Sequence, residues 1–207
     1  MILLTDTVRN STKSFVIDME QLPIRLTKGL FYANMVNSHH GIAHTSRVVY
    51  AAYLLCNAMA LPKQERSACC IAAIIHDLGK RNDYEGAEHG MNSMELYKDR
   101  IKAIILDESM QKRTLDAVRY HSIEDKDCPG SVRQDVIWKV LKDADALDRS
   151  RFLGKGCDMS FLRLGIYQTT AGQNIIELTK QLPKWTNCFE GTQPYTEIVN
   201  AVNKYTE

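Results

Sequence analysis

The sequence has no apolar run long enough to cross a membrane and no regular cysteine framework. Its apolar runs stay well below the roughly 18 residues that a transmembrane helix needs. The six cysteines include no C-x-x-C pair, so we expect neither a zinc ribbon nor a disulfide scaffold. The first residues, Met-Ile-Leu-Leu-Thr-Asp, lack the basic start and the long apolar segment of a signal peptide. We therefore expect a soluble, cytoplasmic protein with reduced thiols.

An excess of charge of either sign is also missing. The formal net charge of +1 over 207 residues excludes the broad basic surface that extended nucleic-acid binding requires. A local basic pocket for a small phosphorylated ligand remains compatible with this balance. The composition is that of an ordinary globular protein, with 44% hydrophobic and 25% charged residues. Its length suits one domain with a sizeable core.

Apolar residues recur at helical spacing through most of the chain, whereas alternating strand patterns are scarce. The segment at residues 14–18 is the exception, and its apolar run indicates a short strand or a buried arm. These patterns predict an all-α, single-domain helical bundle over residues 1–207. It has an N-terminal arm at 1–38, a motif-bearing core at about 39–152 and unassigned C-terminal helices at 153–207. The predicted helices cover about 42–60, 62–77, 89–100, 108–121, 132–151, 171–182 and 196–205.

The histidines are confined to one part of the chain. All six lie between positions 39 and 121, and the last 86 residues have none. One of them, His76, is followed by Asp77 at the end of a nearly uniform apolar helix. Burying an aspartate there is costly unless something compensates its charge, and a bound cation does so at least cost. The His76-Asp77 pair therefore indicates a metal site.

Five ordered blocks include this pair and the residues around it. They are His40-Gly-Ile-Ala-His44, Ile75-His-Asp-Leu-Gly-Lys80, Gly86-Ala-Glu-His89, Tyr120-His121-Ser and Lys142-Asp-Ala-Asp-Ala-Leu-Asp-Arg149. Together they resemble the H…HD…D signature of the HD superfamily of metal-dependent phosphohydrolases, in its two-metal branch. The first block resembles the family's first ligand helix, and the second resembles its His-Asp doublet with a trailing lysine. The third and fourth look like the extra histidine motifs of the two-metal branch, and the last resembles the terminal aspartate motif.

The resemblance implies two divalent transition-metal ions, with iron or manganese expected first and nickel, zinc, cobalt or magnesium as alternatives. Imidazole suits such ions, and a carboxylate adds charge and can bridge two of them. Asp77 is then both a bridging ligand and a catalytic residue, and the nucleophile is a metal-bound hydroxide. The implied ligands are His44, His76, Asp77 and Asp145 for the first ion, and Asp77, His89 and His121 for the second.

The late aspartate is ambiguous from the residues alone. Asp143, Asp145 and Asp148 share one predicted helix, with Asp148 nearest its apolar face and the other two at the borders. Helical position therefore does not choose the ligand. The resemblance favours Asp145, because the family's ligand is the aspartate of an Ala-Asp-x-Leu block. Asp148 can instead pair with a nearby arginine or support a ligating histidine.

Basic residues around the predicted metals are candidates for binding substrate phosphate. Lys80 follows the doublet directly and resembles the family's charge-stabilising lysine, so we also predict a catalytic role for it. Arg149 and Arg151 have an alternative interpretation, in which they are solvated charges at a helix end. The predicted substrate-binding residues are His40, Arg47, Lys80, Arg149 and Arg151.

We expect a metal-dependent phosphohydrolase, a phosphomonoesterase or phosphodiesterase, whose partner is a nucleotide or similar small phosphorylated metabolite. An HD-type di-iron oxygenase that cleaves a C–C or C–P bond is the alternative, because it uses the same ligand set. A catalytically idle ligand-binding domain is a third reading, which the complete ligand set disfavours. Spacing in the sequence does not separate hydrolysis from oxygen activation.

Overall fold

The computed structural model describes residues 2–152, 162–186 and 193–206. Within these ranges the regular structure is helical, apart from a single bridge between Ile2 and Thr206, so the all-α prediction is confirmed. None of the described helices is long and apolar enough to span a membrane. The α-helices are α1 Asp6–Glu20, α2 Ile42–Ala58, α3 Lys63–Ile75, α4 His89–Ile104, α5 Glu108–Tyr120, α6 Gly130–Gln134, α7 Val136–Leu147, α8 Thr170–Trp185 and α9 Pro194–Tyr205, with short 3₁₀ segments η1 Lys28–Leu30, η2 Asp125–Asp127, η3 Asp148–Arg151 and η5 Gly165–Gln168.

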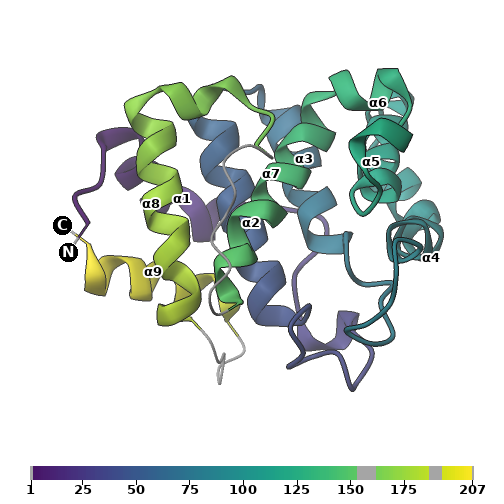
Figure 1. Ribbon diagram of the computed structural model, residues 1–207, viewed down its shortest axis with the longest axis horizontal. Coiled ribbons are helices and arrows are strands. Elements are labelled where there is room, and N and C mark those ends of the chain that lie inside the picture. Colours follow the sequence, from purple (N-terminus) through teal and green to yellow (C-terminus); the bar gives the residue numbers. More distant parts are fainter. Residues whose placement is uncertain (1, 153–161, 187–192, 207) are drawn as a thin grey trace.

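Helix α2 is the centre of the bundle (Figure 1) and contacts α1, α3, α7, α8 and α9. It is rich in apolar and small residues around its whole circumference, and most of its side chains are buried. Its start is set by Gly41, where an added Cβ would lie 2.3 Å from the carbonyl oxygen of Val36. The close approach lets the amide of Ile42 donate to that same oxygen at 3.0 Å. The position of α2, which carries His44, thus depends on a glycine, because any side chain here would prevent this close approach.

Residues 14–18 belong to helix α1, so the prediction of a strand or buried arm is wrong. The consecutive apolar residues Phe15, Val16 and Ile17 suggested a strand, but only Phe15 is fully buried and Ile17 is 61% exposed. The buried face runs through Val8, Phe15 and Met19 at helical spacing. The ring of Phe15 packs against Tyr50, Tyr53 and Tyr195, which attaches α1 to α2 and α9.

The helix predicted at 132–151 is interrupted twice. Asp135 has an extended backbone between α6 and α7, and its side chain accepts the amide hydrogen of Ile137 at 2.8 Å as the N-cap of α7. Arg113 on α5 holds the same carboxylate at 2.6 Å, so a partner distant in sequence supports the break. The second interruption follows Leu147, where the α-helix ends and the chain continues as the 3₁₀ segment η3.

Helices α3 and α7 pack against α2, α5 packs against α3 and α7, and α4 packs against α5. The C-terminal ends of α3 and α5 lie beside the start of α4, where Asp77, His121 and His89 approach one another. The described cysteines, Cys56, Cys69, Cys70 and Cys128, are free and buried, as the thiol prediction requires. Cys157 and Cys188 lie outside the described residues.

Candidate metal centre

Five helices contribute the predicted metal ligands, and each delivers its ligand at or near an end. His44 is in the first turn of α2, and His89 is the first residue of α4. His76 and His121 directly follow α3 and α5 as their C-caps. Asp145 lies in the last turn of α7. The ligand side chains converge on the carboxylate of Asp77, in the turn after α3.

One carboxylate oxygen of Asp77 faces a first group of ligands. Its Oδ2 lies 3.4 Å from Nε2 of His44 and 3.4 Å from Nε2 of His76. The two Nε2 atoms are 3.2 Å apart, and Asp145 Oδ1 lies 3.5 Å from His44 Nε2. His44, His76 and Asp145 form one group whose ligand atoms all lie within 4.8 Å of one another. They fit the donor set predicted for the first ion.

The other oxygen of Asp77 faces a second group. Its Oδ1 lies 3.2 Å from Nε2 of His89 and 3.4 Å from Nε2 of His121. The two Nε2 atoms are 3.1 Å apart. Asp77 therefore lies between two histidine pairs, with one oxygen directed at each.

Backbone carbonyls orient three of these imidazole rings. His76, His89 and His121 each donate Nδ1–H to the carbonyl oxygen three residues earlier, which directs Nε2 at Asp77. The acceptors are Ala73 at 2.8 Å, Gly86 at 2.6 Å and Val118 at 2.7 Å. All three rings thus direct the same nitrogen, Nε2, at the centre.

Burial and mutual charge set the protonation of the centre. Burial alone would raise the pKa of Asp77, but the charge of His76 and hydrogen bonds from the neighbouring histidines hold it well below its usual range. Burial disfavours protonation of His76, yet the carboxylate of Asp77 raises its pKa. Burial lowers the pKa of His121 to about 4, so this ring is neutral at pH 7. An ionised carboxylate and a neutral imidazole are the forms that bind metals.

The turn after α3 packs closely against α4. An added Cβ at Gly79 would lie 2.3 Å from the amide nitrogen of Ser93, and the Gly79 amide donates to Ser93 Oγ at 2.8 Å. Lys80, next in sequence, is only 3% exposed. Its Nζ lies 3.4 Å from the carbonyl oxygen of Glu85 and 3.4 Å from His89 Nδ1. The ammonium group therefore lies behind His89, and none of the described carboxylates forms an ion pair with it.

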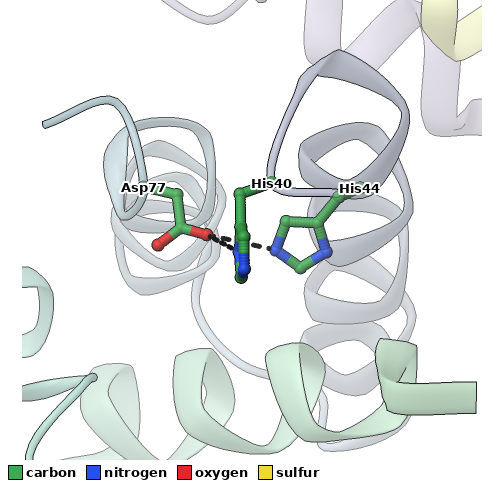
Figure 2. Close-up of side chains that lie close together, drawn as sticks. All are labelled: His40, His44 and Asp77. Atoms are coloured by element: carbon green, nitrogen blue, oxygen red, sulfur yellow. Dashed lines mark hydrogen bonds and ion pairs between the residues drawn. The ribbon is translucent and has the colours of Figure 1, made fainter. Parts of the chain in front are cut away.

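His40 lies beside the centre without belonging to either histidine pair. Its Nδ1 is 2.8 Å from Asp77 Oδ2, and Figure 2 shows its ring and that of His44 directed at the same carboxylate. Burial lowers the pKa of His40 below its usual value. A neutral ring donates Nδ1–H to Asp77 and keeps the lone pair of Nε2 for another partner.

Two of the arginines predicted to bind substrate are directed elsewhere. Arg47 is buried and binds both carboxylate oxygens of Asp148, at 2.6 and 3.2 Å. Arg151 reaches the same carboxylate at 3.3 Å. Asp143 faces away from the centre and accepts hydrogen bonds from the amides of Arg163 and Leu164. Of the three aspartates Asp143, Asp145 and Asp148, Asp145 is therefore the one whose carboxylate lies near Nε2 of His44, at 3.5 Å, while Asp148 contacts the outer nitrogen Nδ1 of the same ring. Asp143 holds a later segment.

A comparison with protein-family models identifies the family of the segment that contains this centre. Residues 41–150 match the model of the HD domain, and this span is more than half of the chain. The chain belongs to the HD domain family. The match includes every predicted metal ligand, from His44 to Asp145. No curated protein and no solved structure shows a significant match.

A pocket of about 850 Å³ opens on one side of the HD centre. His40, Asp77, His89, His121 and Asp145 line this pocket, and Arg149 also contributes to its wall. Lys80, Arg47 and Arg151 are not among its lining residues. Sequence reasoning missed part of the wall, although a polar run after His121 was a visible signal. These additional residues are Ser122, Glu124, Asp125, Lys126, Lys142 and Arg163.

Proposed function

We propose that this HD protein is a metal-dependent phosphohydrolase that cleaves a phosphoester of a nucleotide or a similar small phosphorylated metabolite. The observation that carries the proposal is the division of the Asp77 carboxylate between two histidine pairs. Its Oδ1 and Oδ2 lie 3.2–3.4 Å from the Nε2 atoms of separate pairs. Asp77 could therefore contribute one oxygen to each of two ions, which would supply the two-metal chemistry of phosphoryl transfer.

The donor atoms fit divalent transition metals. Four imidazole nitrogens and the oxygens of two carboxylates suit iron, manganese, nickel or zinc better than calcium, which prefers oxygen ligands alone. Each histidine directs a lone-pair nitrogen at the centre, and at 3.1–3.5 Å these atoms repel one another unless a proton or cation lies between them. When bound, the ions would supply Lewis-acid activation of a phosphoryl group and lower the pKa of a coordinated water.

The chain's own residues would bind and orient the substrate. The pocket, at about 850 Å³, is of the size that admits a small metabolite. Arg149 is exposed and forms no ion pair with any described carboxylate, so its guanidinium group can bind a phosphate oxygen. His40 also lines the pocket, where its Nε2 could accept a hydrogen bond from a substrate hydroxyl or water. Asp77 and Asp145 line the same pocket, so a substrate bound there would lie beside the proposed metal ions.

Metal content tests the two-ion part of the proposal. Purified, metal-replete protein should approach two transition-metal ions per chain. Replacing both His89 and His121 by alanine removes the second pair and should lower the content to about one ion. Elemental analysis measures both values. At most one ion in the wild type, unchanged in the double variant, would contradict the two-ion proposal.

Turnover tests the reaction. A panel of nucleotides, cyclic dinucleotides and sugar phosphates is incubated anaerobically with protein loaded with manganese, nickel or magnesium. Release of phosphate or of a monoester product is expected, and it should be absent from the Asp77→Asn variant. Dioxygen consumption by an iron-loaded, mixed-valence form, with no anaerobic hydrolysis of any phosphoester, would instead assign the same ligands to an oxygenase.

A further inference from the structure

His44 differs from the other three histidines of the centre in what holds its outer nitrogen. His76, His89 and His121 donate Nδ1–H to backbone carbonyls, whereas Nδ1 of His44 lies 2.7 Å from Oδ2 of Asp148. A carboxylate is a stronger acceptor than a carbonyl, so its hydrogen bond holds the ring of His44 more firmly in one orientation. Only His44 has this partner among the four rings, all of which lie in described parts of the chain.

Asp148 is itself held in place from more than one side. Its side chain is 3% exposed, and the guanidinium group of Arg47 binds Oδ1 at 2.6 Å and Oδ2 at 3.2 Å. Arg151 approaches Oδ2 at 3.3 Å. Burial alone would raise the pKa of Asp148, but Arg47 and the hydrogen bond with His44 hold it below the usual value. The carboxylate is therefore ionised and fixed in orientation.

Arg47 has a second partner, which lies outside the part of the chain that matches the HD family model. Its Nη1 donates to the carbonyl oxygen of Thr186 at 3.0 Å. Thr186 is the C-cap of α8, a helix that packs against α2 and η3. A continuous set of contacts thus runs from the end of α8 through Arg47 and Asp148 to the ring of His44.

We propose that Asp148 and Arg47 are positioning residues for the first metal, and that the end of α8 holds Arg47 in place. Asp148 fixes the tautomer and ring angle of His44, so that Nε2 faces the centre. The C-terminal helix α8 thereby contributes to metal binding without supplying a ligand. This inference rests on the proposed metal centre and does not depend on which reaction the centre catalyses. Loss of such a supporting partner typically lowers metal affinity about 10- to 100-fold.

The test compares two buried aspartates of the same chain segment. Asp148→Asn should weaken one of two Co²⁺ binding steps about 10- to 100-fold and change the visible absorption of that ion. Asp143→Asn is the matched control, because Asp143 is also buried and also paired with an arginine, Arg163, but does not contact the histidines. It should leave both binding steps unchanged. The His89→Ala/His121→Ala double variant, which keeps only the first site, assigns the affected step.

Arg47→Lys provides a second variant if Asp148→Asn does not fold. Lysine keeps the positive charge but cannot bind both carboxylate oxygens and the Thr186 carbonyl together. We expect it to weaken the same Co²⁺ step several-fold. Wild-type affinity for both ions in folded Asp148→Asn or Arg47→Lys protein would overturn the inference, as would equal weakening of both steps.

The readout separates this inference from the proposed reaction. Co²⁺ affinity and absorption are measured without turnover. A protein that binds two Co²⁺ ions, loses one step in Asp148→Asn and hydrolyses no phosphoester would retain the inference and lose the proposed function. A wild-type protein that binds no Co²⁺ would overturn the inference.

Discussion

Asp143 and Asp145 lie two residues apart on α7 and have different neighbours. Asp145 has a side chain that is 26% exposed, and it lies 3.5 Å from His44 Nε2. Asp143 is fully buried and receives the amide hydrogens of Arg163 and Leu164 at 2.8 and 2.9 Å. The first faces the metal centre, whereas the second attaches the chain after residue 161 to α7.

Substitution of the two aspartates should therefore have different consequences. Asp145→Asn should weaken binding of the first ion and abolish activity with little loss of stability. Asp143→Asn should keep both ions and destabilise the fold by about 1–3 kcal/mol, because several donors lose a charged acceptor. Elemental analysis and urea unfolding measure the two effects. The opposite ranking would place the ligand at Asp143.

Lys80 is a buried ammonium group whose described neighbours supply no carboxylate partner. Its contact at 3.4 Å to the Glu85 carbonyl oxygen is weak compensation for a buried charge. Because Lys80 does not line the pocket, we expect its charge to act on a substrate phosphoryl group across the ring of His89, without direct contact. Lys80→Ala should therefore keep the metal content and lower kcat by roughly 10²–10³-fold.

Lys80→Arg should restore only part of that activity, because the guanidinium group is longer and planar. Steady-state kinetics and metal analysis on the same preparations make the comparison. A change in kcat of less than about twofold in Lys80→Ala would remove Lys80 from the catalytic group.

At the scale of elements, the turn at Gly79 sets how closely α4 approaches the end of α3. A Cβ at this position would lie 2.3 Å from the Ser93 amide nitrogen and force α4 outward. Since His89 begins α4, Gly79→Ala should cost about 1–3 kcal/mol of stability and weaken the second metal site. Thermal unfolding and metal titration measure these effects.

The matched control is Gly130→Ala, at the start of α6. No atom lies within 4 Å of a Cβ placed there, so the fold has room for it. This variant should change stability by no more than about 0.5 kcal/mol and keep both ions. If Gly79→Ala behaves like Gly130→Ala, the close packing of the turn does not control the position of α4.

Local sequence patterns predicted most helices but not those that depend on distant partners. Helix α1 was missed because the adjacent apolar residues at 15–17 suggested a strand, while its buried face is completed by Tyr50, Tyr53 and Tyr195. The break at Asp135 depends on Arg113 from α5.

The site shows the same division. The histidines and Asp77 could be predicted as one site, because their order along the chain resembles the motif order of a known family. The placement of Asp143 and of Arg47 could not be predicted, since it depends on Arg163 and Thr186, 20 and 139 residues away in sequence. These contacts form only when the C-terminal helices pack on the core.

For the whole molecule, metal binding should couple to unfolding. The predicted ligands come from five helices. One of these is α2, against which the N-terminal helix α1 and the helices α8 and α9 pack. We infer that the chain unfolds as one unit and that ions bound only by the folded state raise its stability. At 100 times the dissociation constant, one ion contributes about 2.7 kcal/mol.

That stabilisation corresponds to a rise in Tm of about 5–10 °C for a chain of this size. Calorimetry of the same protein with Mn²⁺ and with a chelator should show one transition that moves by this amount. Two separate transitions, or a Tm that does not respond to chelation, would contradict the inference.

The rings of His76 and His121 also affect how their helices end. Each follows the last residue of a helix and donates its Nδ1–H to a carbonyl of the final turn, Ala73 in α3 and Val118 in α5. Such terminal carbonyls otherwise lack an intrahelical donor. A metal that holds both rings would therefore act as a remote cap on two helices. Amide hydrogen exchange in the last turns of α3 and α5 should slow when metal binds, while the middle of each helix changes little.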